Sequence, residues 1–357
     1  MRKYDYSFLK NKVPGKVFGL TGIISDLRSK EEFRKLQYSD TFEVLRQKAV
    51  IESVEGSNAI EGIVTTRSRL EDIVSGAKPE THDEKEIAGY KDALSLIHDK
   101  HEEIDVNEEL IMALHRMIQE QTDPEKAGKY KKTDNVIMEY DPDGSRHVRF
   151  RPVEAKNIGH DMEQMLLAFY DARQDPEIPA LLLIPCFVLD FLCVHPFTDG
   201  NGRISRLLTV LILYQSGYDI VSYISLEGQI NKYRDKYYEA LKASSESWHD
   251  NNNDYTPFIV YFLQIMYRCF KDLDDSFTTI SLKKAKKSER VESILLDAAV
   301  PVSKNEILDK VPDVSVKTVE LVLRRMLKEK KIKKIGTYRD ARYMRNYDQS
   351  IREECSR

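Results

Sequence analysis

Apolar residues spaced three and four positions apart dominate most of the chain, and this spacing is typical of amphipathic helices. Residues 180–194 are apolar nearly all round, which indicates a helix in the core, with Pro185 as an alternative first residue. A further apolar helix over 204–215 is expected to end at Gly217. The same spacing predicts helical segments within 32–74, separated by a turn near Gly62, and helices over 84–101, 107–120, 153–173, 229–245 and 255–271.

Two short runs of strand-forming residues interrupt this helical pattern. Residues 135–138 and 147–150 flank a Pro-Asp-Gly sequence at 142–144. Such runs on both sides of turn residues predict a β-hairpin, with an ordinary surface loop as the alternative. Strand-like alternation is otherwise scarce, so the expected fold class is mainly α.

The C-terminal part of the chain has a different organisation. Residues 282–290 are polar and basic and are interpreted as a linker. Beyond them we expect a helix over 289–298, a second over 304–310 capped by Ser303, and a third capped by Ser315 that runs to about Lys328. A small hairpin is expected within 332–344, around Gly336. Three helices and a hairpin in this order predict a winged helix-turn-helix domain.

Composition places the chain among globular proteins of two or three domains. It has 357 residues, 41% hydrophobic and 32% charged, with a formal net charge of −4. No apolar run approaches the ~20 residues of a membrane helix, and residues 1–16 lack the apolar core of a signal peptide. We therefore expect no membrane partner and a cytoplasmic location. Cys186 and Cys193 lie in the apolar 180–194 segment, where a core role is favoured over a metal site or disulfide.

The densest chemistry lies in the loop that follows residues 180–194, His195-Pro-Phe-Thr-Asp-Gly-Asn-Gly-Arg-Ile-Ser-Arg206. This loop precedes a helix, and the free N–H groups and positive dipole end of a helix N-terminus favour phosphate. Gly200 and Gly202 let a ligand approach the backbone closely. The guanidiniums at 203 and 206 share a helix face and suit phosphate oxygens.

Two further side chains of the loop supply reactive groups. Asp199 offers a carboxylate of the kind that holds Mg²⁺ beside nucleotide phosphates. His195 can take up a proton near neutral pH. The alternative is a glycine-rich capping loop whose histidine and arginines only pair with carboxylates, and the presence of the whole set in register disfavours it.

These twelve residues reproduce, without departure, the motif of the Fic family, His-Pro-Phe-x-Asp/Glu-Gly-Asn-Gly-Arg-x-x-Arg. The resemblance extends from about Asn107 to Cys269 and more weakly upstream. It implies an all-α core with a β-hairpin flap over the active site, in which His195 deprotonates the target hydroxyl. The remaining roles that it implies are Mg²⁺ binding by Asp199, an anion hole of Gly200, Asn201 and Gly202, a grip on the α/β-phosphates by Arg203, and one on the γ-phosphate by Arg206.

Two other segments resemble the family less sharply. Residues 128–138 resemble the start of the flap, which aligns the target by strand-like pairing. Val136, Ile137 and Met138 are therefore expected near the nucleotide and the target. Tyr237 and Tyr238 resemble tyrosines that border the adenine pocket, with packing in a helical core as the alternative; some relatives have an Asn further along, where Ser245 stands here.

An inhibitory motif of the family, Ser/Thr-x-x-x-Glu-Gly/Asn, is matched by residues 57–62. Ser57 and Glu61 are four residues apart and face one way on a helix, which Gly62 can end. By this resemblance the Glu61 carboxylate would pair with Arg206 and compete with the γ-phosphate. The alternative is a capped surface helix.

The resemblance implies a protein adenylyltransferase, which is a nucleotidyltransferase. It would move AMP from ATP, with Mg²⁺, to a Tyr, Ser or Thr hydroxyl of a target protein or of itself, release pyrophosphate, and be autoinhibited by Glu61. An enzyme that removes AMP and a nucleotide-sensing DNA-binding regulator are the alternatives. The expected domains are an N-terminal helical region over 1–106 with the inhibitory motif, a Fic-type catalytic core over 107–272, and a winged helix over 283–350.

Basic residues are concentrated in the expected winged helix. Between Lys317 and Arg345 there are eleven Lys or Arg residues against three acidic residues. A basic third helix and wing suit DNA phosphates, but docking to a protein is favoured equally. A homodimer is expected by analogy with Fic proteins of this layout.

Overall fold

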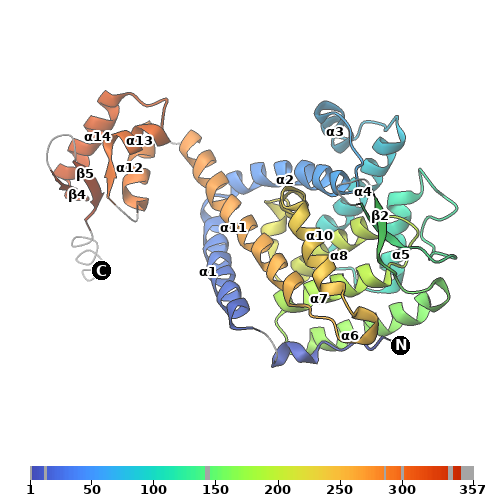
Figure 1. Ribbon diagram of the computed structural model, residues 1–357. Helices are drawn as coiled ribbons and strands as arrows, with labels where there is room; N and C mark the ends of the chain where they lie inside the picture. Colours follow the sequence, from blue (N-terminus) through green and yellow to red (C-terminus); the bar gives the residue numbers. More distant parts are fainter. Residues whose placement is uncertain are drawn as a thin grey trace. The chain divides into compact units, whose positions relative to one another are not determined.

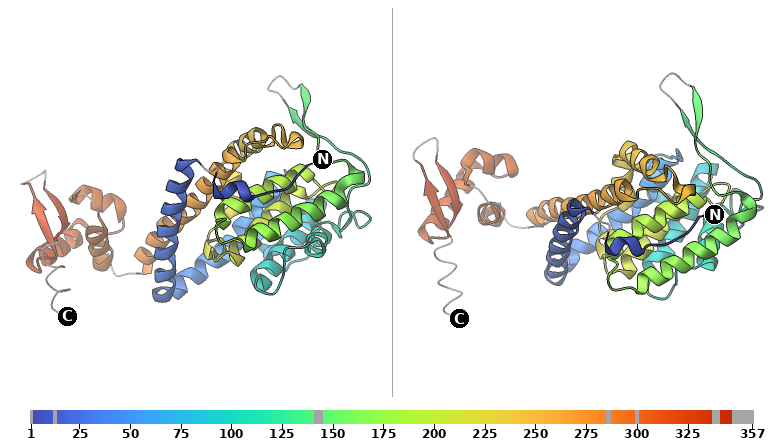
Figure 2. Two further views of the ribbon diagram at one scale, coloured as in Figure 1. Left: turned by 90° about the horizontal axis from the view of Figure 1, so that it is seen from below. Right: turned by 60° about the horizontal axis from the view of Figure 1, so that its bottom comes forward.

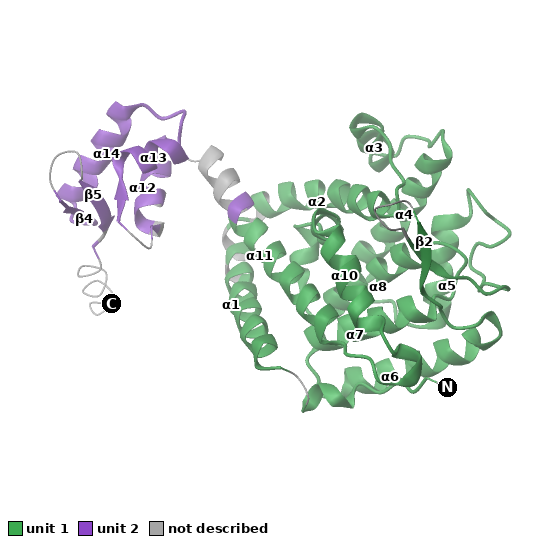
Figure 3. Cartoon of the chain, viewed as in Figure 1, with its two compact units in different colours: residues 1–274 green, residues 275–357 purple. Residues whose placement is uncertain are grey.

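The structure, a computed structural model, describes residues 2–11, 14–140, 145–284, 287–298, 301–336 and 341–346. The chain forms two compact units, residues 1–274 and 275–357 (Figure 3). Helices dominate the first unit, as the apolar spacing predicts, so the mainly α fold class is confirmed. The domain boundaries expected at residues 106, 272 and 283 stay predictions.

Among the described residues, the first unit holds helices and one hairpin, and its last helix, α11, continues past residue 274 into the second unit (Figure 1). Its elements in chain order are η1 (Ser7–Lys10), α1 (Gly15–Gln37), α2 (Ser39–Ile60), α3 (Arg67–Val74), α4 (His82–Lys100), α5 (Glu108–Gln119), β1 (Ile137–Tyr140), β2 (Arg146–Phe150), η2 (Ala155–Asn157), α6 (Ile158–Gln174), α7 (Ala180–Val194), α8 (Asn201–Gln215), η3 (Asp219–Ser222), α9 (Leu226–Lys232), α10 (Arg234–Ser245), η4 (Trp248–Asp250) and α11 (Thr256–Lys284).

Helices α7 and α8 form the centre of this unit. Nearly every residue of both is buried. This follows from apolar composition on all sides of α7, whereas the first turns of α8 also bury polar side chains, Asn201, Arg203 and Arg206 among them. Pro185 was the alternative first residue of α7, but the helix begins at Ala180 and Pro185 lies inside it. The proline removes one backbone donor only, and burial of the surrounding apolar side chains holds the helix together. At the other end of the pair, Gly217 has a φ of 74° and ends α8 as predicted.

Besides the start of α6 at Ile158 instead of residue 153, four helix boundaries differ from the predicted ones. Helix α1 was not predicted before residue 32, because its glycines weaken the pattern; burial of Val17 and Ile24 stabilises it. Helix α8 begins at Asn201 rather than at 204, since the Gly200 carbonyl accepts the first helical hydrogen bond. The segment 229–245 is two helices, α9 and α10, which meet at Tyr233, whose ring packs against the guanidinium of Arg268.

The fourth difference concerns the predicted linker at 282–290. Helix α11 continues to Lys284, and α12 already begins at Lys287. Lysine and serine do not end a helix in the way that glycine or proline does, so a polar, basic composition was a weak signal for a linker.

The predicted hairpin is present in the first unit. Strands β1 and β2 pair antiparallel, with a register irregularity between Ile137 and Met138. Both views of Figure 2 show these strands projecting from the helical body. The predicted Pro-Asp-Gly turn at 142–144 lies outside the described residues.

Helix α2 is held at a fixed place by close backbone packing. A Cβ on Gly56 would lie 2.7 Å from the backbone nitrogen of Gly228 in α9, so α2 and α9 touch through their main chains. At the end of α2, Gly62 has a φ of 81°, and its N–H and that of Ile63 donate to the carbonyls of Ala59 and Asn58. These bonds stop the helix at Ile60 and leave Glu61 at its C-cap.

Among its described residues, the second unit packs helices on a three-stranded sheet, in which β5 (Arg342–Arg345) lies between β3 (Val302–Ser303) and β4 (Ile332–Ile335). Ser303 and Ser315 cap α13 and α14 as predicted, and Ser303 forms a capping box with Glu306. The winged helix-turn-helix assignment stays a prediction. The elements are α12 (Lys287–Asp297), β3 (Val302–Ser303), α13 (Lys304–Lys310), α14 (Val316–Lys328), β4 (Ile332–Ile335) and β5 (Arg342–Arg345).

Replacing Gly56 by alanine is expected to destabilise the protein. The added methyl group must push α2 away from the α9 backbone, and such overpacking typically costs about 1–3 kcal/mol. Thermal unfolding monitored by circular dichroism should therefore show a lower Tm for Gly56→Ala. The matched control is Gly22→Ala in α1, where an added Cβ meets no atom within 4 Å, and which should leave Tm unchanged or higher. Equal Tm values for wild type and Gly56→Ala would contradict the packing argument.

Candidate active site

The loop between α7 and α8 is held rigidly at both ends. His195 is the C-cap of α7 in the left-handed region, with φ 50° and ψ 62°. The side chain of Asn201 accepts a hydrogen bond from the Phe197 N–H at 3.0 Å and donates one to the Phe197 carbonyl at 2.9 Å. A non-glycine residue in this backbone region persists only where the surroundings enforce it, and these bonds, with the buried helices, do so.

The imidazole of His195 is arranged to accept a proton at one nitrogen. Its Nδ1 lies 3.1 Å from the Leu192 carbonyl, which can only accept, so Nδ1 carries the proton and Nε2 is bare. Burial lowers the pKa of His195 to about 4, and the ammonium of Lys131 acts in the same direction. The ring is therefore neutral at pH 7, which is the form that a general base needs.

A second histidine, His115 of α5, contacts the loop between α7 and α8. Its ring stacks on Phe197, with centroids 3.8 Å apart. Its Nδ1 accepts from the Gly128 N–H at 2.9 Å, and its Nε2 donates to the Asp199 carbonyl at 3.2 Å. Burial lowers the pKa of His115 to about 4, so this neutral arrangement persists at pH 7. Sequence reasoning missed His115; a buried polar residue on the apolar face of a predicted helix was the available signal.

Lys131 lies in the segment 128–138 that was predicted to begin the flap, but no role for its side chain was predicted. Its backbone N–H donates to the Pro196 carbonyl at 2.9 Å, and its ammonium donates to the Asn135 side chain at 2.7 Å. Burial lowers the pKa of Lys131 to about 8. This residue joins the flap to the position next to His195.

The predicted inhibitory motif, at the end of α2, packs against the first turns of α8. Arg206 donates through Nε to the Ser57 hydroxyl at 2.8 Å, and through one terminal nitrogen to Glu61 Oε1 at 2.7 Å. A Cβ on Gly202 would lie 2.2 Å from that same Glu61 oxygen, so the carboxylate rests against the backbone at the start of α8. Glu61 therefore fills the place where the helix N-terminus and Arg206 together attract an anion. Although burial lowers it, the charge of Glu61 raises the pKa of Arg206 above its usual range, so the guanidinium stays charged.

Arg203 is placed differently from Arg206. Its side chain is 0% exposed and forms an ion pair with the buried Glu86 of α4, and a longer one, 3.4 Å, with Asp199. It does not line the cavity described below, so it orients Asp199 here, and its predicted grip on phosphate stays a prediction. Glu86 was not recognised from the sequence, because its partner lies 117 residues away.

Asp199 supplies the single carboxylate of the loop, and this carboxylate is open to solvent. Its side chain is 73% exposed, and its Oδ1 accepts the Gly200 N–H at 2.7 Å. Within the described part of the chain, no group of three or more His, Cys, Asp or Glu side chains is placed to hold a metal ion. Mg²⁺ usually keeps several waters and takes one or two carboxylates together with substrate phosphates. We call the place where Arg206 and the start of α8 attract an anion the anion seat. A single exposed carboxylate beside this seat fits that coordination.

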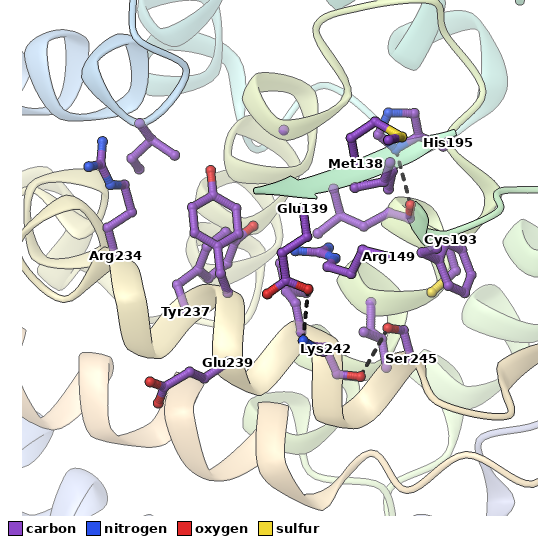
Figure 4. A pocket seen from close by; sticks show the side chains of 18 of the residues that line it. Met138, Glu139, Arg149, Cys193, His195, Arg234, Tyr237, Glu239, Lys242 and Ser245 are labelled. Carbon is purple, nitrogen blue, oxygen red and sulfur yellow. Dashed lines mark hydrogen bonds and ion pairs between the residues drawn. The ribbon is translucent and has the colours of Figure 1, made fainter. Parts of the chain in front are cut away.

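A cavity of about 940 Å³ adjoins the loop (Figure 4). Its lining includes Glu61 and Arg206 and the length of α10 from Arg234 to Ser245. Of the residues predicted from the sequence, those that line it are Glu61, Ile137, Met138, His195, Gly202, Arg206, Tyr237 and Tyr238. Those that do not line it are Ser57, Gly62, Val136, Asp199, Gly200, Asn201 and Arg203.

Two contacts connect the flap with α10 beside the cavity. Glu139 of β1 pairs with Lys242 at 2.7 Å, and the Arg149 guanidinium lies 5.9 Å from the Tyr238 ring centroid (Figure 4). These three polar cavity residues, Glu139, Arg149 and Lys242, were not predicted. Their roles depend on where the hairpin folds back, which a single sequence does not state.

The cysteine prediction is confirmed. Cys186 and Cys193 are buried and free, and Cys193 also lines the cavity floor. The structure contains no helix, among the residues it describes, that is long and apolar enough to cross a bilayer.

Comparisons with known proteins agree with this geometry. Residues 105–213 match the Fic/DOC family model. The chain is 30% identical over 249 residues to protein adenylyltransferase fic-1 of Caenorhabditis briggsae, covering 67% of this chain and 43% of that protein. It is 28% identical over 246 residues to protein adenylyltransferase Fic of Nematostella vectensis, covering 65% and 49%. The chain thus spans less than half the length of these curated relatives.

Solved structures show the same fold. A Fic family protein from Desulfovibrio desulfuricans G20 matches with a TM-score of 0.62 at 17% identity, covering 94% of this chain and 97% of that one. A Fic domain containing signaling protein from Bacteroides thetaiotaomicron VPI-5482 matches with a TM-score of 0.59 at 22% identity, covering 70% and 94%. The class is therefore that of Fic-fold proteins. More specifically, residues 105–213 form a Fic/DOC domain.

His195 is expected to stay neutral far below the usual range of histidine. Because burial lowers its pKa to about 4, its ring should gain a proton only as the pH falls toward that value. NMR of ring-labelled histidine should show a His195 resonance that does not move between pH 8 and pH 5.5, with the proton on Nδ1. A His195→Gln spectrum assigns the signal. A titration midpoint near the ordinary value of about 6.5 would contradict the burial argument.

Proposed function

We propose that this chain is a protein adenylyltransferase that moves AMP from ATP to a hydroxyl of a protein or of itself and is held inactive by Glu61. One observation carries the proposal: a carboxylate occupies an anion seat, formed by Arg206 and the start of α8, beside a neutral imidazole in a nucleotide-sized cavity. The similarity to proteins named protein adenylyltransferases supports it.

The proposed reaction uses groups of this chain at each stage. The phosphates bind at the N-terminus of α8, where backbone N–H groups, the dipole and Arg206 oppose their charge. His195 Nε2 accepts the proton of the target hydroxyl, and the hydroxyl oxygen attacks the α-phosphorus. The bond between that phosphorus and the bridging oxygen breaks, and pyrophosphate leaves with the electron pair. Positioning and charge stabilisation supply most of the catalysis.

Asp199 is the group that would hold Mg²⁺ in this arrangement. When bound, the ion supplies positive charge to the α- and β-phosphates. Asp199 itself is oriented by Arg203 and by the hydrogen bond from the Gln119 amide at 3.4 Å.

The nucleoside is proposed to extend along α10. Tyr237 and Tyr238 lie next to the phosphate end, and the chain from Tyr238 to Ser245 borders the rest of the cavity. Ile137 and Met138 of the flap cover it from the opposite side, where a target segment would pair with the hairpin.

Replacing Glu61 by glycine is expected to activate the protein. Loss of the carboxylate frees Arg206 and the start of α8 for the γ-phosphate. Incorporation of label from ATP labelled at the α-phosphate should rise at least about tenfold. A tenfold rise corresponds to about 1.4 kcal/mol of lost competition between Glu61 and the γ-phosphate. Mass spectrometry of the incubated protein identifies the added AMP and the modified residue.

Two control variants make this test specific. Glu55→Ala alters an exposed glutamate of the same helix, which pairs with Arg67, and should leave transfer at the wild-type rate. His195→Ala in the Glu61→Gly background should abolish transfer. Labelling that is no higher in Glu61→Gly than in wild type would overturn the proposed brake, and loss of AMP from a pre-modified protein would favour the de-AMPylating alternative.

A second proposal concerns unit 2 and the choice between DNA and protein docking. We propose that unit 2 binds DNA, because of the distribution of its charges. The carboxylates of Glu292, Glu306, Asp313, Glu320 and Glu329 pair with other cations of the unit. A group of cations on α14, on the turn after it and on β4 has no ion pair among the described residues. This basic stripe consists of Lys317, Arg324, Lys328, Lys330, Lys333 and Lys334.

Neutralising the basic stripe is expected to weaken DNA binding. Cations that contact phosphates release counterions, so affinity should fall steeply with salt, and the double variant Lys317→Ala/Arg324→Ala should flatten that slope. Fluorescence anisotropy of the full chain with a random-sequence duplex measures both. Lys310→Ala, a cation of α13 outside the stripe, is the control. Absence of binding at low salt would favour protein docking.

The homodimer and the cytoplasmic location stay predictions.

A further inference from the structure

A buried carboxylate in α7 has no part in the proposed reaction. Asp190 is 0% exposed and lies five residues before His195. It accepts hydrogen bonds from the Tyr6 hydroxyl at 2.9 Å, from the Trp248 indole at 2.7 Å and from the Tyr255 hydroxyl at 2.9 Å. A charge this deep in the core persists only when it is fully paired, so its donors fix where this part of α7 lies.

Two of the groups around Asp190 come from the beginning of the chain, which we call the N-terminal strap (residues 2–10). Besides the Tyr6 hydroxyl, the strap supplies the guanidinium of Arg2, which pairs with Asp190 at 3.4 Å. Arg2 also donates to the Trp248 carbonyl and to the Asn253 side chain, both at 2.9 Å. The strap therefore supplies the only cation with an ion pair to this carboxylate among the described residues.

The strap also reaches the base of the flap through one aromatic side chain. The Arg2 guanidinium lies 4.8 Å from the Trp248 ring centroid, and the Tyr4 ring meets Trp248 edge-on. Trp248 also contacts Phe150, the last residue of β2. The next residue, His249, stacks on Phe150 and bonds the Arg151 carbonyl at 2.7 Å.

These contacts converge on the elements that form the reaction site. Leu189, Leu192 and Cys193, which surround Asp190 in the sequence, line the cavity floor. The Leu192 carbonyl is the group that fixes the proton of His195 on Nδ1. Displacement of α7 at Asp190 would therefore move both the floor of the cavity and the acceptor that orients the imidazole.

We propose that the N-terminal strap is a positioning element of the active site: through Asp190 it holds the last turn of α7, and through Trp248 it holds the base of the flap, so that His195 faces the nucleotide correctly. Arg2, Tyr6 and Asp190 are positioning residues in this account, since none of them lines the cavity. The inference rests on the proposed function for its kinetic consequences, but its structural consequence at His195 is independent of it.

The test uses strap variants of the full chain in the activated Glu61→Gly background. Arg2→Ala removes the cation, and Tyr6→Phe keeps the ring and removes only the hydroxyl that Asp190 accepts. Each should lower kcat for AMP transfer about tenfold or more, while the Kd for ATP, measured by calorimetry, changes less than twofold. A role in stability alone would leave kcat unchanged at temperatures where the protein is folded. Lys10→Ala, which removes a surface ion pair at the end of the strap, is the control and should change neither value.

A second readout does not depend on transfer. The NMR signals of the His195 ring should shift in Arg2→Ala and Tyr6→Phe and stay at their wild-type positions in Lys10→Ala. If Glu61→Gly shows no transfer but these signals move, the proposed function fails and the positioning role stands. If folded Tyr6→Phe keeps both kcat and the His195 signals, the positioning role is overturned, even where Arg2→Ala does not fold.

Discussion

The buried guanidinium of Arg206 is the constraint on which the site depends. A charge at this depth requires a counter-charge, and removing the partner of a buried ion pair is strongly destabilising. Glu61 supplies the counter-charge in the absence of nucleotide, and a phosphate group would supply it when nucleotide is bound. The proposed inhibition and the charge balance of the buried site thus depend on one ion pair. The same reasoning explains why the carboxylate sits at a helix C-cap, where Gly62 fixes its direction toward the start of α8.

The precision of the loop comes from its surroundings rather than from its own sequence. Two buried helices fix its ends. Asn201, His115 and Lys131 form hydrogen bonds with its backbone carbonyl groups. Both His115 and His195 are neutral because burial lowers their pKa values, so neither changes charge near pH 7. Lys131, whose positive charge acts on His195, differs from them, because burial lowers its pKa to about 8.

Local patterns in the sequence predicted most of the helices, the hairpin, the caps at Ser303 and Ser315, and the reactive loop. They failed where the outcome depends on distant partners. Nothing near Arg2 or Glu86 in the sequence indicates that each would meet a charge on α7 or α8, and Pro185 looked like a helix start because its tolerance depends on burial. The contact of Glu61 with Arg206, which spans 145 residues, was predictable because the motif that carries Glu61 is local to one helix turn.

The region before residue 106 contains two elements with opposite effects on the same site. Helix α2 brings Glu61 onto the anion seat, whereas the N-terminal strap supports the helix that carries His195. A deletion that removes the whole region would therefore remove the proposed brake and also leave Asp190 without its cation. Because a buried carboxylate without its partner must move or take up a proton, such a deletion is a poor test of autoinhibition. Point changes at residue 61 separate the two effects, since they leave the strap in place.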